Sequence, residues 1–306
     1  MIRIGLVADD LTGACDSALP FLPGGRVLVG LWPCVPSFGG LVCAAVSTES
    51  REAPEAAALE RGAEAARRLL AGSALLFRKL DSMLRGHPAA DLAGALEAAG
   101  GRCVVAPALP GEGRVTAGGV QRWPGGSADI RRLLTPLANR VEVRDAATDA
   151  ELDMVAAEAL ARGDRVLAGT AGLAAALARA LGAGPMPAAV RPGCVRPLAV
   201  VGSRAAARQA DVARALGEDV QVVEPGALPV LDGHDGLVLT GGETAARVLR
   251  HVGASAVELL GQALPRAPLG RVRGGRLDGL PVVLKAGAFG GDDALHRALE
   301  ALRAPR

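Results

Sequence analysis

Residues 1–16 read MIRIGLVADDLTGACD, and this stretch contains two adjacent carboxylates between a strand-like and a helix-like segment. The apolar run Ile2–Ala8 predicts a buried strand, and a helix is expected to begin near Thr12. Asp9 and Asp10 lie at the junction. Two neighbouring carboxylates repel each other, so a cation or a hydrogen-bond donor should lie close by. They are expected either to cap the helix or to hold a substrate hydroxyl or a metal ion.

The rest of the chain repeats the same order of strand and helix. Short apolar runs predict strands at Ile2–Ala8, Arg26–Leu31, Gly40–Ser47, Ala74–Lys79, Arg102–Ala106, Arg165–Ala168, Pro197–Gly202, Val220–Val223, Gly236–Thr240 and Pro281–Lys285. Segments rich in Ala, Leu and Arg predict helices between them, including Ala53–Leu70, Ala89–Ala99, Ala150–Arg162, Ala171–Ala180, Ser203–Leu216 and Thr244–Val252. Strands that alternate with helices indicate an α/β fold whose parallel sheets are flanked by helices. Ligands of such sheets bind beyond the carboxyl ends of the strands.

One segment has neither helical nor strand periodicity. Residues 182–197, GAGPMPAAVRPGCVRP, are rich in Pro and Gly, which is typical of a linker. We therefore expect two domains, residues 1–185 and 195–306, each built on a largely parallel sheet. The alternative is a long surface loop within a single domain.

The composition argues against several classes of function. The 306 residues include 34 basic and 32 acidic side chains, so the net charge of +2 gives no basis for binding nucleic acid or an anionic membrane. Aromatic residues make up only 2% of the chain, which disfavours base stacking. The sequence shows neither a signal peptide nor an apolar run long enough to span a membrane, so a cytoplasmic protein is expected.

Cysteine and histidine spacing predicts neither disulfides nor a metal site. The five cysteines are odd in number and form no CxxC pair, which indicates reduced thiols. The four histidines are scattered, so no zinc site follows from their spacing.

Three strand ends in the C-terminal half carry a turn rich in glycine or hydroxyl groups, followed by a helix. These turns are Gly202-Ser203, the TGGET run Thr240–Thr244, and the run Lys285–Gly291. Glycine lets backbone N–H groups approach a ligand, and a helix N-terminus carries about half a positive charge. Together the turns predict a phosphate or nucleotide pocket. Neither GxxxxGK[ST] nor GxGxxG occurs in the chain.

Charged and hydroxyl side chains follow three strands of the N-terminal half. In chain order they are Asp9, Asp10, Arg51, Lys79, Asp81, Ser82 and Arg85. Cations bind a carboxylate and aspartates accept hydroxyl protons, so the set suits a small polyhydroxylated anion. For any one of these residues, a cap or a surface ion pair is the alternative.

Several stretches occur in the order found in the four-carbon acid sugar kinase family, which the chain resembles. They are ADDLTGACD, STESR, KLDSMLRG, PALPGEGRVTAGG, GTAGLAAALA, VVGSRAAARQ, TGGETA and LKAGAFGG. The resemblance implies an α/β N-terminal domain that binds the acid sugar and an α/β C-terminal domain that binds ATP, with the active site in the cleft between them. It also implies phosphorylation of threonate, erythronate or an oxo-tetronate on the terminal hydroxyl, with ATP and Mg²⁺ as cofactors.

The resemblance assigns residues to both sites and none to a metal. It places Asp9, Asp10, Arg51, Lys79, Asp81, Ser82 and Arg85 at the sugar acid. It places Ser203, Gly241, Gly242, Glu243, Thr244 and Gly287 at ATP. We predict Asp10 as the base that receives the hydroxyl proton and Asp9 as a substrate or structural hydrogen-bond acceptor, with Asp81 behind them.

Three features depart from the family pattern. Ala286 stands where the family usually has serine, which removes a hydroxyl from the last turn. Thr170 replaces serine and keeps the hydroxyl. The region between Arg114 and Asp145 is shorter than the same region in members of that family. Loops of this region could shape the substrate pocket, so the shortening bears on which acid sugar is bound.

We predict an ATP-dependent acid sugar kinase. The alternatives are a non-catalytic binder of nucleotide or sugar acid, and a hydrolase that uses Asp9, Asp10 and Mg²⁺ on a phosphate ester. The expected partners are the acid sugar and ATP, without nucleic acid or membrane, and a homo-oligomer is left open.

Overall fold

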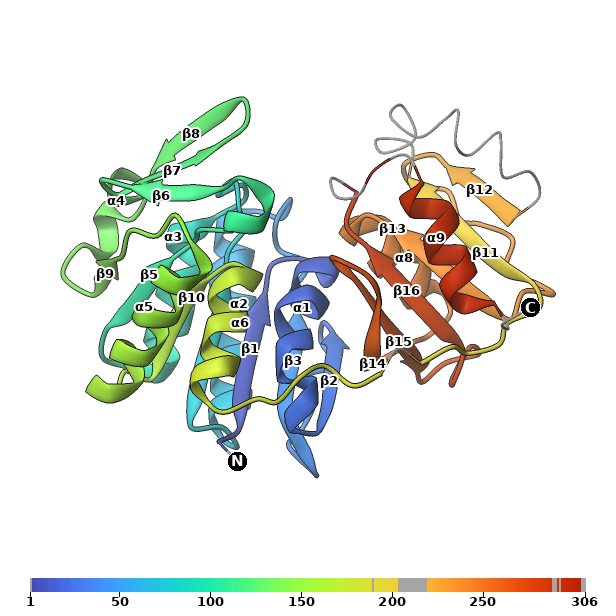
Figure 1. Ribbon diagram of the computed structural model, residues 1–306, viewed down its shortest axis with the longest axis horizontal. Helices are drawn as coiled ribbons and strands as arrows, with labels where there is room; N and C mark the ends of the chain where they lie inside the picture. The colour runs from blue at the N-terminus through green and yellow to red at the C-terminus, as the bar shows by residue number, and fades with distance from the viewer. Residues whose placement is uncertain (1, 189, 203–218, 288–290, 292, 304–306) are drawn as a thin grey trace. The chain divides into compact units, whose positions relative to one another are not determined.

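A computed structural model describes residues 2–188, 190–202, 219–287, 291 and 293–303 (Figure 1). The chain divides into two compact units, Met1–Pro185 and Met186–Arg306. The division falls inside the segment 182–197, which is rich in Pro and Gly. Within the described ranges, no helix is both long and apolar enough to cross a membrane.

The first unit is built on a sheet in which every described pairing is parallel. In order across the sheet the strands are β2 (Arg26–Leu31), β3 (Leu41–Ser47), β1 (Ile4–Ala8), β4 (Leu75–Lys79), β10 (Val166–Gly169), β5 (Cys103–Ala106) and β9 (Val141–Val143). Because these strands run the same way, their carboxyl ends meet at one edge. That edge carries the residues that follow β1, β3 and β4.

Helices cover both faces of this sheet. On one face lie α2 (Glu55–Leu70) and α3 (Pro88–Ala99), and on the other α1 (Leu11–Ala18), α5 (Asp149–Arg162) and α6 (Ala171–Ala180). Glycine allows α2 and α3 to approach closely, because a Cβ on Gly94 would lie 2.7 Å from the carbonyl oxygen of Leu59. Short 3-10 turns occupy Leu19–Gly24, Pro110–Glu112 and Thr135–Leu137.

A small antiparallel sheet occupies much of the region between Arg114 and Asp145. It contains β6 (Val115–Ala117), β7 (Val120–Trp123) and β8 (Gly126–Asp129), and the short helix α4 (Ile130–Leu133) follows it. Gly118 and Gly119, with φ of +63° and +77°, form the tight turn between β6 and β7. The sequence analysis missed these strands because they are very short and most of their side chains are polar or exposed.

The second unit has a mixed sheet. Its order is β12 (Val220–Val223), β11 (Pro197–Gly202), β13 (Gly236–Thr240), β16 (Pro281–Lys285), β15 (Ala267–Arg273) and β14 (Ala256–Leu264). The strands β12, β11, β13 and β16 pair in parallel, whereas β15 is antiparallel to both β16 and β14. The helices α8 (Gly242–His251) and α9 (Ala294–Leu302) pack against the sheet, and α9 buries Leu295, Leu299 and Leu302 in the core.

The predicted α/β class is confirmed, and all ten predicted strands occur with ends shifted by at most two residues. The β14–β15 hairpin was not predicted, because it interrupts the alternation of strand and helix on which the prediction relied. Its two-residue turn is Pro265-Arg266, with Arg266 at a φ of +62°. The predicted helix Ser203–Leu216 lies outside the described residues.

Candidate functional site

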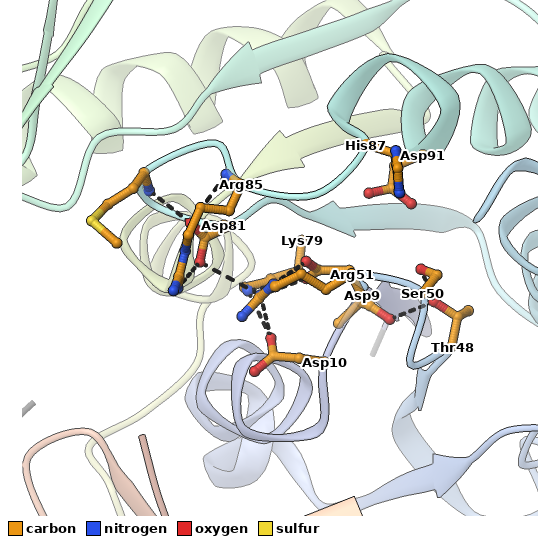
Figure 2. Close-up of polar contacts among 12 residues, drawn as sticks. Asp9, Asp10, Thr48, Ser50, Arg51, Lys79, Asp81, Arg85, His87 and Asp91 are labelled. Carbon is orange, nitrogen blue, oxygen red and sulfur yellow. Dashed lines mark hydrogen bonds and ion pairs between the residues drawn. The ribbon is translucent and has the colours of Figure 1, made fainter. Parts of the chain in front are cut away.

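The two adjacent aspartates follow β1, and Arg51 reaches them from the loop after the neighbouring strand β3. Arg51 Nε donates to Asp9 Oδ2 at 2.6 Å, and Nη2 donates to Asp9 Oδ1 at 2.9 Å. The same Nη2 donates to Asp10 Oδ1 at 2.7 Å. One guanidinium therefore holds both carboxylates, and Figure 2 shows it lying between them and the next loop.

Lys79 ends β4, the other neighbour of β1, and adds a second cation to the pair. Its Nζ lies 3.0 Å from Asp10 Oδ1 and 3.3 Å from Asp9 Oδ1, and the side chain is buried. The ammonium approaches over the first turn of α1, at Gly13. A Cβ there would lie 2.4 Å from Lys79 Nζ and 2.4 Å from Asp10 Oδ1. Glycine at this position leaves room for the ion pair.

The loop after β4 carries the remaining charged residues. Asp81 Oδ2 accepts hydrogen bonds from the backbone N–H of Met83 at 3.1 Å and of Arg85 at 3.3 Å. Arg85 also donates from Nε to Oδ2 at 2.8 Å and from Nη2 to Oδ1 at 2.7 Å. Leu84 takes a left-handed conformation, with φ of +56°, which is costly for a residue other than glycine. The Asp81 carboxylate therefore stabilises the strained turn at Leu84 by binding the N–H groups on both sides of it.

The three aspartates and three cations form one connected network. Arg51 Nη2 also lies 3.5 Å from Asp81 Oδ1, so Arg51 contacts all three carboxylates. Burial alone would raise the pKa of Asp10, but the charges of Lys79 and Arg51 outweigh it and hold that pKa well below its ordinary value. Burial likewise opposes the fall at Asp81, whose pKa is lowered mainly by the Arg85 hydrogen bond and the Lys79 charge. Asp10 and Asp81 are therefore anions at neutral pH.

The alternative that Asp10 only caps a helix is wrong for its side chain. Asp10 occupies the N-cap position of α1, but its carboxylate accepts no capping hydrogen bond. It accepts one from the hydroxyl of Thr12 at 2.7 Å instead. The sequence analysis did not assign Thr12 to the site, although its place in the first turn after the aspartates was a usable signal.

A buried ion pair on the opposite side of β4 was also missed. Arg78 precedes Lys79, so the two side chains point to opposite faces of the sheet. Arg78 is fully buried and pairs with Asp91 of α3. Figure 2 shows Asp91 apart from the main network. Burial raises the pKa of Asp91, and the charge of Arg78 opposes that rise. Arg78 and Lys79 are adjacent in the strand, so their side chains must lie on opposite faces of the sheet. The sequence predicts a buried partner for each only when it is known that helices cover both faces.

Among the predicted sugar-acid residues, Ser82 is the one outside the ion-pair network. It is buried in the same loop, and its hydroxyl accepts a hydrogen bond from Arg114 Nη1. The other six, Asp9, Asp10, Arg51, Lys79, Asp81 and Arg85, are joined by direct contacts. Arg85 is the most exposed of the three cations, with 53% of its side chain accessible.

In the second unit, the predicted nucleotide residues lie around the ends of β13 and β16. Gly241 takes a left-handed φ of +86° before α8, and its N–H donates to the carbonyl oxygen of Lys285 at 2.9 Å. Gly242, Glu243 and Thr244 form the first turn of α8, and Gly287 follows β16. Ser203 lies outside the described residues.

Two buried polar side chains at this edge have few partners. Lys285 is 1% exposed, and within the described ranges its Nζ contacts only the carbonyl oxygen of Ala286, at 3.3 Å. Burial lowers the pKa of Lys285. The neighbouring Thr240 is fully buried, and its hydroxyl has no hydrogen-bond partner in the part of the chain that the structure describes. A buried ammonium and a free hydroxyl donor beside a helix N-terminus form an anion-binding arrangement.

Two family descriptions match the chain in sequence. Residues 4–128 match the "Sugar-binding N-terminal domain" and residues 129–295 match the "Nucleotide-binding C-terminal domain". The D-threonate kinase of Bordetella bronchiseptica is 31% identical over 405 alignment positions, covering 99% of this chain and 98% of that protein. The chain belongs to the four-carbon acid sugar kinase family. The recognition drawn from the sequence motifs is confirmed.

Solved structures share the fold of this family member. A protein of Salmonella typhimurium described as a putative tRNA synthase has a TM-score of 0.74 at 19% identity, covering 99% of this chain and 100% of its own. A Bordetella bronchiseptica protein solved as a domain-swapped dimer with bound citrate has a TM-score of 0.53 at 29% identity, with 99% of both chains covered. The first of these likenesses concerns the fold alone.

The alignment with the Bordetella kinase is longer than this chain. It spans 405 positions against 306 residues, so long stretches of that kinase have no counterpart here. The second family match also begins at residue 129, inside the first structural unit. The family description and the compact units therefore divide the chain at different places.

Replacement of Gly13 by alanine is expected to disturb the site without unfolding the protein. The added Cβ would displace the Lys79 ammonium and the Asp10 carboxylate, both of which end flexible side chains. A displacement of about 1 Å in a catalytic site lowers activity by roughly 10²-fold. Steady-state turnover and the urea midpoint should be compared with those of Gly62→Ala, a change in α2 whose added Cβ would contact no residue of the network. Unchanged turnover in Gly13→Ala would contradict this role for Gly13.

The lowered pKa of Asp81 predicts a particular pH dependence of stability. A carboxylate whose pKa is lower in the folded protein stabilises it above the unfolded pKa of about 4, and this contribution is lost as the pH falls through the folded value. The stability difference between the wild type and Asp81→Asn should therefore be full at about pH 7 and shrink below about pH 4. Urea unfolding at constant ionic strength measures it. A difference that stays constant down to the acid limit would show that the charge of Asp81 does not stabilise the fold.

Proposed function

We propose that this protein transfers the γ-phosphoryl group of ATP to a hydroxyl of a small acid sugar, such as threonate, erythronate or an oxo-tetronate. The observation that carries the proposal is the network of three aspartates and three cations at the strand ends of the first unit. It lies within the part of the chain that matches a sugar-binding domain, in a member of an acid sugar kinase family.

The network suits an acid sugar because it offers both kinds of recognition. Carboxylate oxygens of Asp9, Asp10 and Asp81 accept hydrogen bonds from substrate hydroxyls, since an ionised carboxylate offers about four acceptor sites. Arg85 is half-exposed and retains donors for a substrate carboxylate. A neutral polyol would satisfy only the first of these two requirements.

Asp10 is the best candidate to receive the hydroxyl proton. Asp9 is 2% exposed and accepts hydrogen bonds from both Nε and Nη2 of Arg51, whereas the Asp10 side chain is 13% exposed. The lowered pKa of Asp10 makes it a weak base, which suits a phosphoryl transfer with a loose transition state, where positioning and charge matter more than early proton removal. Asp10 would orient the hydroxyl and accept its proton as the new bond forms.

The second unit would bind ATP at the ends of β13 and β16. Backbone N–H groups of residues 242–244, in the first turn of α8, and the Lys285 ammonium suit phosphate oxygens. Mg²⁺ bound to ATP would neutralise phosphate charge. Among the described residues no cluster of three or more metal-ligating side chains occurs, and the three aspartates of the network are already paired with cations.

The alternatives are not favoured. A hydrolase that binds Mg²⁺ through Asp9 and Asp10 would need these carboxylates free of competing cations, and Arg51 and Lys79 hold both.

A homo-oligomer is supported by the domain-swapped dimer of the Bordetella relative, and light scattering of the purified protein tests it. The proposed kinase function is tested by ADP formation with ATP and Mg²⁺ across a panel of four-carbon acid sugars. Absence of ADP formation with every acid sugar of the panel would reject the proposed function.

Replacement of Asp10 by asparagine should separate orientation from proton acceptance. Asparagine keeps the shape but accepts no proton, so kcat should fall by roughly 10²-fold or more while ATP affinity is unchanged. The matched variant is Asp9→Asn, which we expect to lower affinity for the sugar acid more than kcat. Turnover near that of the wild type in Asp10→Asn would remove Asp10 from the chemical step.

Replacement of Lys285 by methionine should weaken ATP binding without weakening the fold. Methionine is similar in length and removes a buried ammonium, whose burial is unfavourable without a counter-ion. We expect the KM for ATP to rise roughly tenfold, the KM for the acid sugar to stay the same, and the urea midpoint to stay the same or rise. A lower midpoint with an unchanged KM for ATP would instead assign Lys285 to the fold.

A further inference from the structure

The small antiparallel sheet contributes one fully buried polar side chain to the substrate edge of the first unit. Gln121 lies in the middle of β7 and is 0% exposed. Its Nε2 donates one hydrogen bond to the carbonyl oxygen of Ser82 at 3.1 Å and another to that of Pro107 at 2.9 Å. Its Oε1 accepts from the hydroxyl of Thr116 at 2.6 Å. Both amide hydrogens are therefore used, and the amide has one orientation.

These two carbonyl groups belong to the loops that follow β4 and β5, two strands that β10 separates in the main sheet. Ser82 follows β4 and lies inside the loop that carries Asp81 and Arg85. Pro107 directly follows β5. Gln121 thus joins the substrate loop to a second strand end through one side chain. A buried backbone carbonyl that loses its donor is costly, so the bond fixes the position of the loop.

The loop needs support from outside because of its own conformation. Leu84 is held at a φ of +56°, and the Asp81 carboxylate caps the turn only from within. The outer side of the loop contacts Gln121 at the Ser82 carbonyl and Arg114 at the Ser82 hydroxyl. Strained turns persist when the surrounding contacts hold them.

The small sheet is itself fixed independently of this loop. Thr116 and Ala146 exchange backbone hydrogen bonds of 2.8 and 3.1 Å. The Asp145 carboxylate accepts from the N–H groups of Gly118 and Gly119 at 2.6 and 2.9 Å. Gln121 therefore projects from an anchored element, and loss of its amide would release the loop and not the sheet.

We propose that Gln121 is a positioning residue, which holds residues 81–85 in the conformation that binds the acid sugar and so sets the affinity for that substrate. The expected change in KM rests on the proposed function, whereas the expected change in the conformation of residues 81–85 does not. Gln121 is expected to act through the Ser82 backbone and not to touch the substrate. Its removal should therefore raise the KM for the sugar acid more than it lowers kcat.

The test compares Gln121→Leu with Thr116→Val in the full-length protein. Leucine keeps the volume but removes both donors, whereas Thr116→Val removes only the hydrogen bond that Gln121 Oε1 accepts and leaves the two that Nε2 donates, to Ser82 and to Pro107. For Gln121→Leu we expect the KM for the acid sugar to rise roughly tenfold, with the KM for ATP unchanged. Thr116→Val should change it far less. Gln121→Met serves if the leucine variant does not fold.

A second measurement does not depend on activity. Amide hydrogen exchange without ligands should be faster at Met83 and Arg85 in Gln121→Leu, and nearly unchanged there in Thr116→Val, because their N–H groups bond to Asp81 only while the loop keeps its shape. Equal effects of the two variants on KM and exchange, or no effect of Gln121→Leu on either, would overturn the inference. Absence of ADP formation by the wild type would reject the proposed function, and the exchange measurement would still decide the role of Gln121.

Discussion

The first unit depends on how the charge of two adjacent aspartates is balanced at the end of β1. Two like charges about 4 Å apart cost about 4 kcal/mol at an effective dielectric constant of about 20. Arg51 and Lys79 each contact both carboxylates at 2.6 to 3.3 Å, so four attractions oppose that one repulsion. Arg51 follows β3 and Lys79 ends β4, and these strands are the two neighbours of β1. This strand order brings both cations to the aspartates.

The strand β4, which ends in Lys79, also fixes the loop that carries Asp81 and Arg85 through a pair on its other face. Because side chains alternate along β4, Arg78 points to the face covered by α3 and meets Asp91 there. The loop between β4 and α3 is therefore held at each end by a buried ion pair. His87 adds a contact of 2.7 Å to the carbonyl oxygen of Ala53 just before α3 begins. Removal of one partner from such a pair leaves a buried charge, typically at a cost of about 3–5 kcal/mol.

The sequence allowed prediction of what depends on local pattern. Apolar runs located all ten strands that were predicted, and charged residues directly after β1, β3 and β4 pointed to the site, because parallel strands bring those ends together. The sequence did not reveal Gln121, Thr12 or the Arg78–Asp91 pair. Gln121 lies in a strand of four residues, which is too short to show a periodic pattern. Arg78 is charged, and the sequence alone predicts an exposed position for such a side chain. The β14–β15 hairpin was missed for a similar reason, since it departs from the strand–helix order.

The two candidate sites differ in how their charges are compensated, and this difference has a consequence for binding. In the first unit each carboxylate already contacts a cation, so a substrate gains little from charge alone and must offer hydroxyl donors that fit the fixed oxygens. In the second unit the described surroundings of Lys285 provide one carbonyl oxygen and no anion. An anionic ligand there relieves an unfavourable burial and stabilises the folded protein by mass action. Under the proposed function, the preorganised network therefore favours selectivity for the sugar acid, and the uncompensated ammonium favours affinity for phosphate.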